Sequence, residues 1–211
     1  FNKDFTKLVV AGNNGAAKKA TVYTISKDNN GAPVLTEEAV IDMAVVGSNL
    51  NDFAWDYAGN LYACGNSSEK LIGWAMPYSG QVVTPAAAKY TFQLPEPIDM
   101  VGTVKRAVQN GNQVIVLTHE ADGTAHIYQV INGKARAELS QEGVIAVDPE
   151  NAGDLLAISD IAVTEDGKLV ATNYMQTQSG DDYVDAGLKR GETRIYIWND
   201  LYDDPSVLFT S

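Results

Sequence analysis

The stretch DFAWDYAGNLYA, residues 52–63, recurs 108 residues later as DIAVTEDGKLVA, residues 160–171. Aspartate, alanine, glycine, leucine and a second alanine fall at the same offsets in both copies. Midway between them, residues 107–116 keep the glycine that precedes an apolar run, and residues 7–11 supply that run again. A period of this length indicates a repeat protein. The equivalent positions, spaced 53, 53 and 55 residues apart, are Leu8, Leu61, Val114 and Leu169.

Each repeat unit has the composition of short antiparallel strands. The dipeptides Asp166-Gly167 and Asn110-Gly111 are typical of tight hairpins, where glycine adopts a positive φ at little cost. β-Branched and aromatic residues predict a third strand around Val22-Tyr23, Ile72-Gly73, Ile127-Tyr128 and Ile195-Tyr196. A fourth strand is predicted at Val34–Glu37, Gln81–Thr84, Lys134–Leu139 and Ser206–Thr210.

Four-stranded units at this period predict an all-β chain of about four β-propeller blades. The units span about residues 1–46, 47–97, 98–152 and 153–211. Only seven residues precede Leu8, too few for an inner strand and its turn, and the last unit stops after its outer strand. We therefore expect the blades to belong to a larger ring of six to eight. The alternative is a four-blade ring that lacks one strand.

The charge balance restricts the classes of partner. The chain has 27 acidic and 15 basic residues, a formal net charge of −12. Such a surface repels nucleic-acid phosphates and anionic lipids, so neither nucleic-acid binding nor membrane-surface binding is expected. Membrane insertion is not expected either, because no stretch approaches the ~18 apolar residues of a membrane span. Glycans, peptides, proteins and metal ions fit this charge better. The single cysteine, Cys64, excludes an internal disulfide and is predicted to be a small buried apolar residue.

One face of the predicted propeller carries both the loops between second and third strands and the connections between blades. In this fold the loops between second and third strands share a face with the connections between blades, and such loops carry function in β scaffolds. Residues 175–192 form the longest of these loops, about a dozen residues longer than the others. The candidate ligand-binding residues on this face are Asn66, His119, Asn173, Tyr174 and Tyr183.

Two sets of carboxylates are candidate metal ligands. Asp181, Asp182 and Asp185 in the long loop offer oxygen atoms of the kind that Ca²⁺ prefers, although their spacing is not that of an EF-hand. The alternative is a solvated acidic loop. Asp52, Lys105 and Asp160 are predicted to be equivalent at the starts of inner strands, which makes the two aspartates weaker metal candidates. Alternatively, each aspartate caps its own turn.

No catalytic signature is visible in the sequence. It contains no glycine-rich phosphate loop, no nucleophile elbow and no zinc-binding helix motif. His119 and His126 have no partners at metal-ligand spacing, so surface roles are expected for both. The sequence therefore favours a protein that is not an enzyme, without deciding the point.

The repeat resembles NHL-type and gluconolactonase-type propeller repeats. Residues 52–62 match the Asp-x-Ala-x-x-x-x-Gly-x-Leu-Tyr core of those families, and residues 160–171 match it except that Val170 replaces the tyrosine. Residues 195–201 and 74–77 look more like uncharacterised propellers of exported or cell-surface bacterial proteins. The second resemblance implies an extracytoplasmic location: periplasmic, cell-surface or secreted. The gluconolactonase likeness implies a calcium-assisted hydrolase, to which Asn66, Asn173, Asp52 and Asp160 would contribute ligands, but no convincing general-base glutamate is present.

Together these features predict a non-catalytic, exported or cell-surface module that binds a glycan, a peptide or a protein on the loop face. Two alternatives stay open. One is a calcium-assisted, lactonase-like hydrolase, in which Ca²⁺ would be the cofactor. The other is a purely architectural segment of a larger assembly, in which the remaining blades of a longer chain would be the partner.

Overall fold

The structure is a computed structural model of the 211-residue chain. It describes residues 1–12, 19–46, 50–65, 68–75, 90–105, 112–131, 135–146, 156, 158–173 and 193–210. No helix in these segments is long and apolar enough to cross a membrane.

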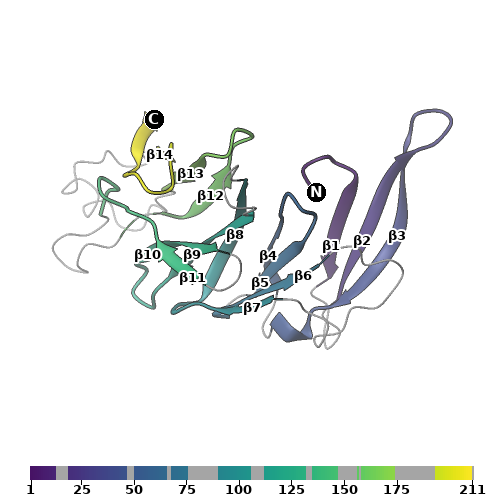
Figure 1. The fold of residues 1–211 in the computed structure, drawn as a ribbon, viewed down its shortest axis with the longest axis horizontal. Helices are drawn as coiled ribbons and strands as arrows, with labels where there is room; N and C mark the ends of the chain where they lie inside the picture. Colours follow the sequence, from purple (N-terminus) through teal and green to yellow (C-terminus); the bar gives the residue numbers. More distant parts are fainter. Residues whose placement is uncertain are drawn as a thin grey trace. The chain divides into compact units, whose positions relative to one another are not determined.

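The described residues form four antiparallel sheets, each made of strands that are consecutive in the sequence (Figure 1). The first sheet contains β1 (Lys7–Gly12), β2 (Lys19–Lys27) and β3 (Pro33–Asp42), and the short 3₁₀ helix η1 (Ala44–Val46) follows it. The second contains β4 (Leu50–Trp55), β5 (Leu61–Gly65), β6 (Lys70–Trp74) and β7 (Tyr90–Gln93). The third contains β8 (Ile98–Lys105), β9 (Asn112–His119), β10 (Ala125–Ile131) and β11 (Ala135–Glu138). The fourth contains β12 (Asp160–Val163), β13 (Leu169–Thr172), β14 (Arg194–Trp198) and β15 (Ser206–Thr210).

This arrangement confirms the all-β prediction and the equivalence of the repeat units. Leu61, Val114 and Leu169 lie on the second strand of their sheets, and Leu8 lies on β1, the first of three strands in its sheet. In the described part of the chain, the first sheet has three strands and begins with β1, which agrees with the expectation that this unit lacks its own inner strand.

Two strands lie elsewhere than predicted. The outer strand of the second sheet is β7, at Tyr90–Gln93 rather than Gln81–Thr84, and residues 76–89 lie outside the described residues. The inner strand of the third sheet is β8, at Ile98–Lys105, so Lys105 ends this strand instead of starting it. The predicted equivalence of Lys105 with Asp52 and Asp160 is therefore wrong. The predicted hairpin at Asn110-Gly111 also lies outside the described residues.

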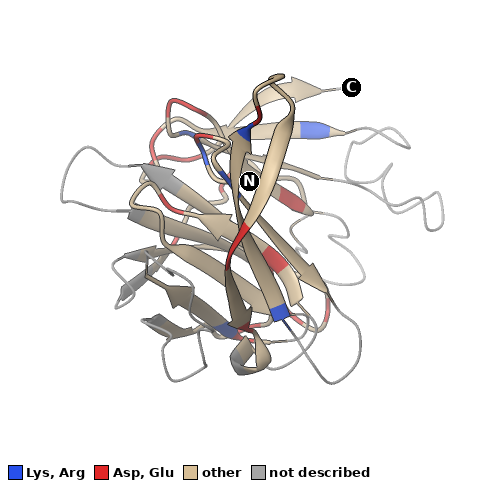
Figure 2. Ribbon diagram, turned by 90° about the vertical axis from the view of Figure 1, so that its right-hand side faces the viewer, with Lys and Arg blue, Asp and Glu red and all other residues tan. Residues whose placement is uncertain are grey.

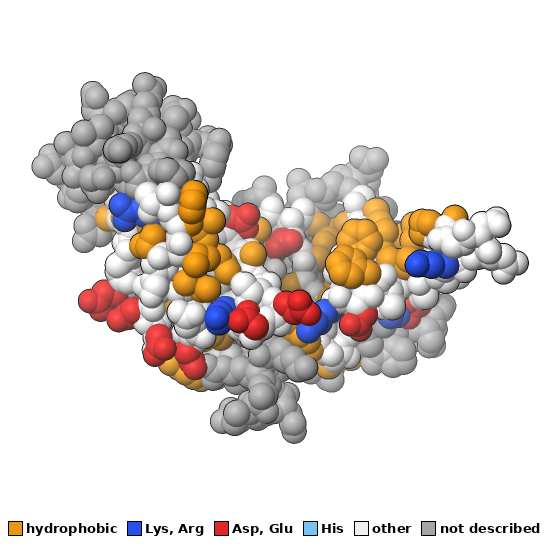
Figure 3. Space-filling model, turned by 90° about the horizontal axis from the view of Figure 1, so that it is seen from above, with side chains coloured by type: hydrophobic (Ala, Val, Ile, Leu, Met, Phe, Trp, Pro, Cys, Tyr) orange, Lys and Arg blue, Asp and Glu red, His pale blue; other side chains and the backbone are white. Residues whose placement is uncertain are grey.

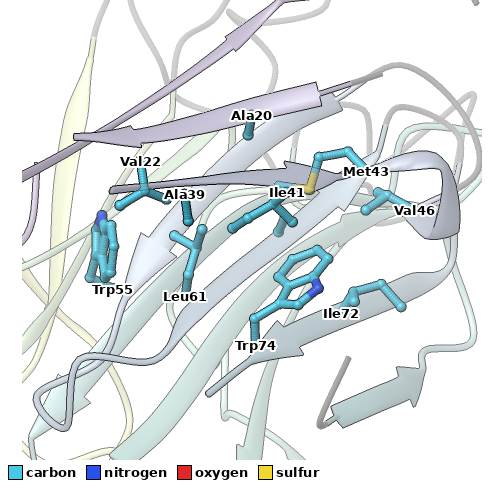
Figure 4. Close-up of a cluster of buried hydrophobic side chains, with 11 residues drawn as sticks. Ala20, Val22, Ala39, Ile41, Met43, Val46, Trp55, Leu61, Ile72 and Trp74 are labelled. Atoms are coloured by element: carbon cyan, nitrogen blue, oxygen red, sulfur yellow. The ribbon is translucent and has the colours of Figure 1, made fainter. Parts of the chain in front are cut away.

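The chain divides into two compact units, Phe1–Thr103 and Val104–Ser211, which are described separately. In the first unit, one side of the second sheet packs against the first sheet (Figure 4). Trp55, Leu61 and Trp74 meet small and branched side chains of β2 and β3, including Val22 and Ile41. The prediction that Trp55 packs between blades is confirmed.

In the second unit, one side of the fourth sheet is equally well buried. Leu169, Ala171, Tyr196 and Trp198 are nearly or fully inaccessible to solvent. The Trp198 indole Nε1 donates a hydrogen bond to the Ser140 carbonyl at 2.7 Å, and the Tyr196 hydroxyl accepts one from the Ile145 amide at 3.2 Å. The aromatic side chains of β14 thus meet both their apolar and their polar requirements in the core.

A five-residue hairpin with a left-handed glycine recurs along the chain. In the β2–β3 hairpin, the Asp28 amide donates to Ala32 O and the Gly31 amide donates to Asp28 O. Equivalent pairs of hydrogen bonds occur at Asp56–Asn60, Glu120–Thr124 and Thr164–Lys168. Each hairpin has its glycine at a φ between 82° and 99°, where an L side chain is strained.

Replacing Gly31 with alanine is expected to lower the free energy of unfolding by about 1–2 kcal/mol. The cause would be backbone strain alone, because a Cβ at Gly31 meets no atom within 4 Å. Urea denaturation followed by circular dichroism measures the change. Gly31→Asn should recover part of the loss, since asparagine tolerates this φ. Gly12→Ala, at an equally open position without a positive φ, is the matched control. Equal effects of the two alanine variants would contradict the strain argument.

Candidate functional site

The predicted loop face can be followed in each unit. In the first unit, the loop between β5 and β6 is bound to the connection between β7 and β8. The Ile98 amide donates to Ser68 O at 2.9 Å, and the Leu94 amide donates to Glu69 O at 2.8 Å. The second-to-third-strand loop and the sheet-to-sheet connection therefore lie side by side, as the fold prediction requires.

The second unit has the same arrangement at the end of β9 and the start of β12. The ring nitrogen Nε2 of His119 lies 2.9 Å from Ile158 O, which places the end of one sheet's second strand beside the start of the next sheet's inner strand. The Ser159 amide donates to Thr172 O at 2.9 Å. Described residues on the loop face in this unit include His119, Ile158, Ser159, Asp160 and Asn173.

Asp52 has a structural role that the sequence suggested only in part. Its Oδ1 accepts a hydrogen bond from the Phe53 amide at 2.8 Å, which is the predicted local cap. Its Oδ2 accepts a second bond, from the Val101 amide of β8, at 2.9 Å. The carboxylate thus joins the second sheet to the inner strand that follows it, with both oxygens bound to backbone amides.

Replacing Asp52 with alanine is expected to lower the free energy of unfolding by about 1–3 kcal/mol, because two backbone amides lose a charged acceptor. Asp160→Ala is the matched control, since Asp160 occupies the equivalent register position and is exposed. Its effect should stay within about 0.5 kcal/mol. Chemical denaturation of both variants measures the difference. Equal losses would show that the bond to Val101 is not what makes Asp52 important.

Cys64 is fully buried, as predicted. Its Sγ lies 4.0 Å from Asp52 O and 3.9 Å from Asp99 O. Burial, assisted by the nearby charges of Asp52 and Asp99, raises the pKa of the thiol from 9.0 to about 12. A neutral, inaccessible thiol is not a nucleophile at ordinary pH.

Asn173 is buried directly after β13 and is bound to Arg194, the first residue of β14. Its Oδ1 accepts a hydrogen bond from the Arg194 amide at 2.6 Å, and the Asn173 amide donates to Arg194 O at 3.3 Å. Among the described residues, the amide nitrogen Nδ2 of Asn173 has no hydrogen-bond partner. Asn173 thus joins the end of β13 to the start of β14, and its buried Nδ2 is left without a partner by the described residues.

His126 lies in a cluster with two glutamates that sequence reasoning missed. Its Nδ1 lies 2.6 Å from Glu138 Oε1 and its Nε2 lies 3.0 Å from Glu120 Oε1. Both ring nitrogens therefore face carboxylates, which a protonated imidazole satisfies best. Glu138 pairs with Tyr128 in the strand register, so it reaches His126 diagonally. The contact with Glu138 depends on where β11 lies. The contact with Glu120 could have been predicted from the sequence of the β9–β10 hairpin alone.

The remaining predicted site residues lie outside the described residues. These are Asn66, Tyr174, Tyr183, Asp181, Asp182 and Asp185, and their roles stay predictions. Within the segments that the structure describes, no three histidine, cysteine or acidic side chains gather as a metal site would require.

Comparison with known proteins identifies the fold and not the family. No family model matches the chain, and no curated protein matches it either. The chain is similar in structure to a protein from Lactobacillus plantarum solved by crystallography, with a TM-score of 0.51 and 13% sequence identity. The likeness covers 97% of this chain and 52% of that one, so the chain spans about half the length of the solved protein. The four sheets are blades of a β-propeller fold and match half of a longer chain, as blades of a larger ring do.

Proposed function

We propose that this protein is a non-catalytic binding module that holds a glycan, a peptide or a partner protein on its loop face. The observation that carries the proposal is that hydrogen bonds to the backbone hold the loops of this face against the connections between sheets. Ser68 and Glu69 are bound to the following connection in the first unit, and His119 adjoins Ile158 in the second. A rigid platform beneath variable loops is the usual way in which β scaffolds present a binding surface.

The distribution of charge supports a neutral or cationic ligand. Acidic side chains are spread over several strands and hairpins instead of gathering in one cluster (Figure 2). With a formal net charge of −12, this surface disfavours polyanions and leaves glycans and peptides as the better candidates. We place the protein outside the cytoplasm, at the cell surface, in the periplasm or secreted, on the resemblance of its strand ends to exported bacterial propellers.

Affinity electrophoresis through gels that contain soluble starch, xylan, pectin or mucin tests the glycan form of the proposal. We expect retardation in at least one gel, and its loss when residues 175–192 are replaced by a short glycine-serine linker. His119→Ala should weaken retardation several-fold. Glu165→Ala, exposed in the β12–β13 hairpin at the opposite end of the strands, is the control. If no gel retards the protein, and immobilised peptide and protein arrays capture nothing either, the loop face is not a binding site.

The hydrolase alternative predicts a different response. A calcium-assisted site that uses Asp52 or Asp160 would give a calcium-dependent rise in Tm that Asp52→Ala or Asp160→Ala abolishes. Both oxygens of Asp52 already accept backbone hydrogen bonds, which favours the structural role at that position. A calcium-dependent rise that both variants leave intact would instead direct attention to Asp181, Asp182 and Asp185.

A further inference from the structure

The second and fourth sheets are built on the same register. Asp52, Phe53, Ala54 and Trp55 of β4 pair with Cys64, Ala63, Tyr62 and Leu61 of β5. In the fourth sheet, residues 160–163 of β12 pair in the same order with residues 172–169 of β13. The third strands match too, because Trp74 pairs with Leu61 and Trp198 with Leu169. Each position in one sheet therefore has a defined equivalent in the other.

In the second sheet, the side that carries Asp52 is covered. Ala54 and Tyr62 are each 8% exposed, Leu71 is 2% exposed and Cys64 is fully buried. The strand β8 supplies polar contacts at this junction. Besides the Val101 amide on Asp52, the Thr103 hydroxyl donates to Trp55 O at 2.6 Å, and the Asn51 side-chain amide donates to Asp99 O at 2.6 Å. An inner strand thus lies against this side of the sheet.

In the fourth sheet, the equivalent side is open. Asp160 and Ala162 are exposed, and Val170, Thr172, Ile195 and Ile197 are only half-buried. Phe209, which pairs with Ile195 and shares its side of the sheet, is 53% exposed. Among the described residues, the Asp160 carboxylate has no hydrogen-bond partner. We name this surface the Asp160 side and define it by Asp160, Ala162, Val170, Ile195 and Ile197.

The composition of the Asp160 side is that of an interface. Apart from Asp160 and Thr172, its central positions are apolar, whereas a sheet side that faces water normally alternates to polar residues. Figure 3 shows that exposed apolar side chains gather in separate patches with charged side chains between them. An apolar sheet side that is left partly open to solvent, as the Asp160 side is, marks a contact with another macromolecule.

We propose that the Asp160 side is a docking surface for a further propeller sheet, whose inner strand donates a backbone N–H to the Asp160 carboxylate and lies over the Val163 carbonyl. The second sheet gives the chemistry of the occupant, since Val101 and Thr103 make these two contacts to Asp52 and Trp55. The chain covers 52% of a solved protein of this fold, which leaves room in such a ring for further sheets. This inference does not depend on ligand binding at the loop face.

A second copy of this chain fits the Asp160 side less well. The sheet of a second copy that could continue the ring is its first sheet, which in the described residues begins with β1 and offers no inner strand in the position of β8. Without that strand, the second copy offers no backbone amide to Asp160 in the way that Val101 offers one to Asp52. The occupant is therefore a further propeller sheet that has its own inner strand.

The test extends the chain with a sheet known to make this junction. Residues 94–139 are appended after Ser211, so that the connection 94–97 follows β15 as it follows β7 in the natural order. Val170→Cys provides a reporter in both the 211-residue and the extended chain. Cys64 is buried with its pKa raised to about 12, so the new thiol is the one that reacts with maleimide.

We expect the labelling of Val170→Cys to slow at least tenfold in the extended chain. Asp160→Ala should restore much of the rate there and leave the rate of the 211-residue chain unchanged, while Glu165→Ala changes neither. An equal rate with and without the added sheet overturns the proposal when far-ultraviolet circular dichroism shows that the added strands have formed. A rate that falls with protein concentration in the 211-residue chain also overturns it, because a second copy would then cover the surface. If labelling in the extended chain stays slow in the Asp160→Ala variant, Asp160 does not contribute to the junction and that part of the proposal is wrong.

Discussion

A Trp74→Ala substitution is expected to lower the free energy of unfolding by about 3–5 kcal/mol. Trp74 is fully buried and lies in the cluster that joins the first two sheets, with Ile41, Leu61 and Ile72 nearby (Figure 4). Alanine removes the indole and leaves a cavity that β-strands, fixed by their ladder hydrogen bonds, cannot close. A loss of this size approaches the whole stability of a small domain.

Urea denaturation, with far-ultraviolet circular dichroism as the signal, measures this loss for Trp74. The fluorescence of the protein changes with the substitution and is a poor probe here. Tyr202→Ala serves as the control, because that aromatic side chain is 66% exposed and its removal should cost little. A loss below about 1 kcal/mol for Trp74→Ala would mean that the contact between the first two sheets does not stabilise the protein.

The second large effect is a loss of stability in alkali that depends on Cys64. The folded-state pKa of the thiol is about 12, above the value of 9.0 for a free thiol. The stability that this group contributes is therefore complete below pH 9 and is lost as the pH rises toward 12, because the unfolded chain gives up the proton first. At 1.4 kcal/mol per pH unit, wild-type protein loses on the order of 2 kcal/mol by pH 10.5 through this group.

Comparison with Cys64→Ala isolates the contribution of the thiol, because tyrosine and lysine residues titrate in the same range in both proteins. The difference in free energy of unfolding between the two proteins should be constant from pH 7 to pH 9 and then shift in favour of the variant. Thiol-specific labelling gives an independent check, since the native wild-type protein should react with iodoacetamide only on unfolding. Parallel curves up to pH 10.5 would show that Cys64 is not shielded from solvent.

The sequence was most informative where the repeat was strongest. The five identities between residues 52–63 and 160–171 predicted two inner hairpins, and the structure pairs both stretches in the same register. Position in that hairpin also predicted that Trp55 packs between sheets. These predictions succeeded because a two-residue alternation and a glycine turn are encoded within a dozen residues.

The prediction failed where several short strands compete for one place. Val82-Val83-Thr84 has the β-branched composition of a strand, but the residues that pair with β6 are Tyr90–Gln93. Residues 98–105 form an inner strand without the alanine and glycine pattern of its siblings. Strand propensity is weak compared with the choice of pairing partner, which is settled by contacts across the sheet.

The candidate site was the least predictable feature. Asp52 was expected to cap its own turn, but its second bond reaches Val101, 49 residues away. The His126 cluster depends on a diagonal contact with Glu138. Such contacts are fixed by the twist and placement of neighbouring strands, which a single sequence does not contain.

Because each described sheet is built from consecutive strands, the chain can fold one sheet at a time. Each strand pairs with a neighbour in sequence, so most native pairing requires only short loop closures, whose entropic cost is small. A blade can therefore form on the ribosome soon after its last strand emerges, before the next one is synthesised. Folding in this order would keep the number of simultaneously exposed strand edges low throughout synthesis, which protects an all-β chain from aggregation.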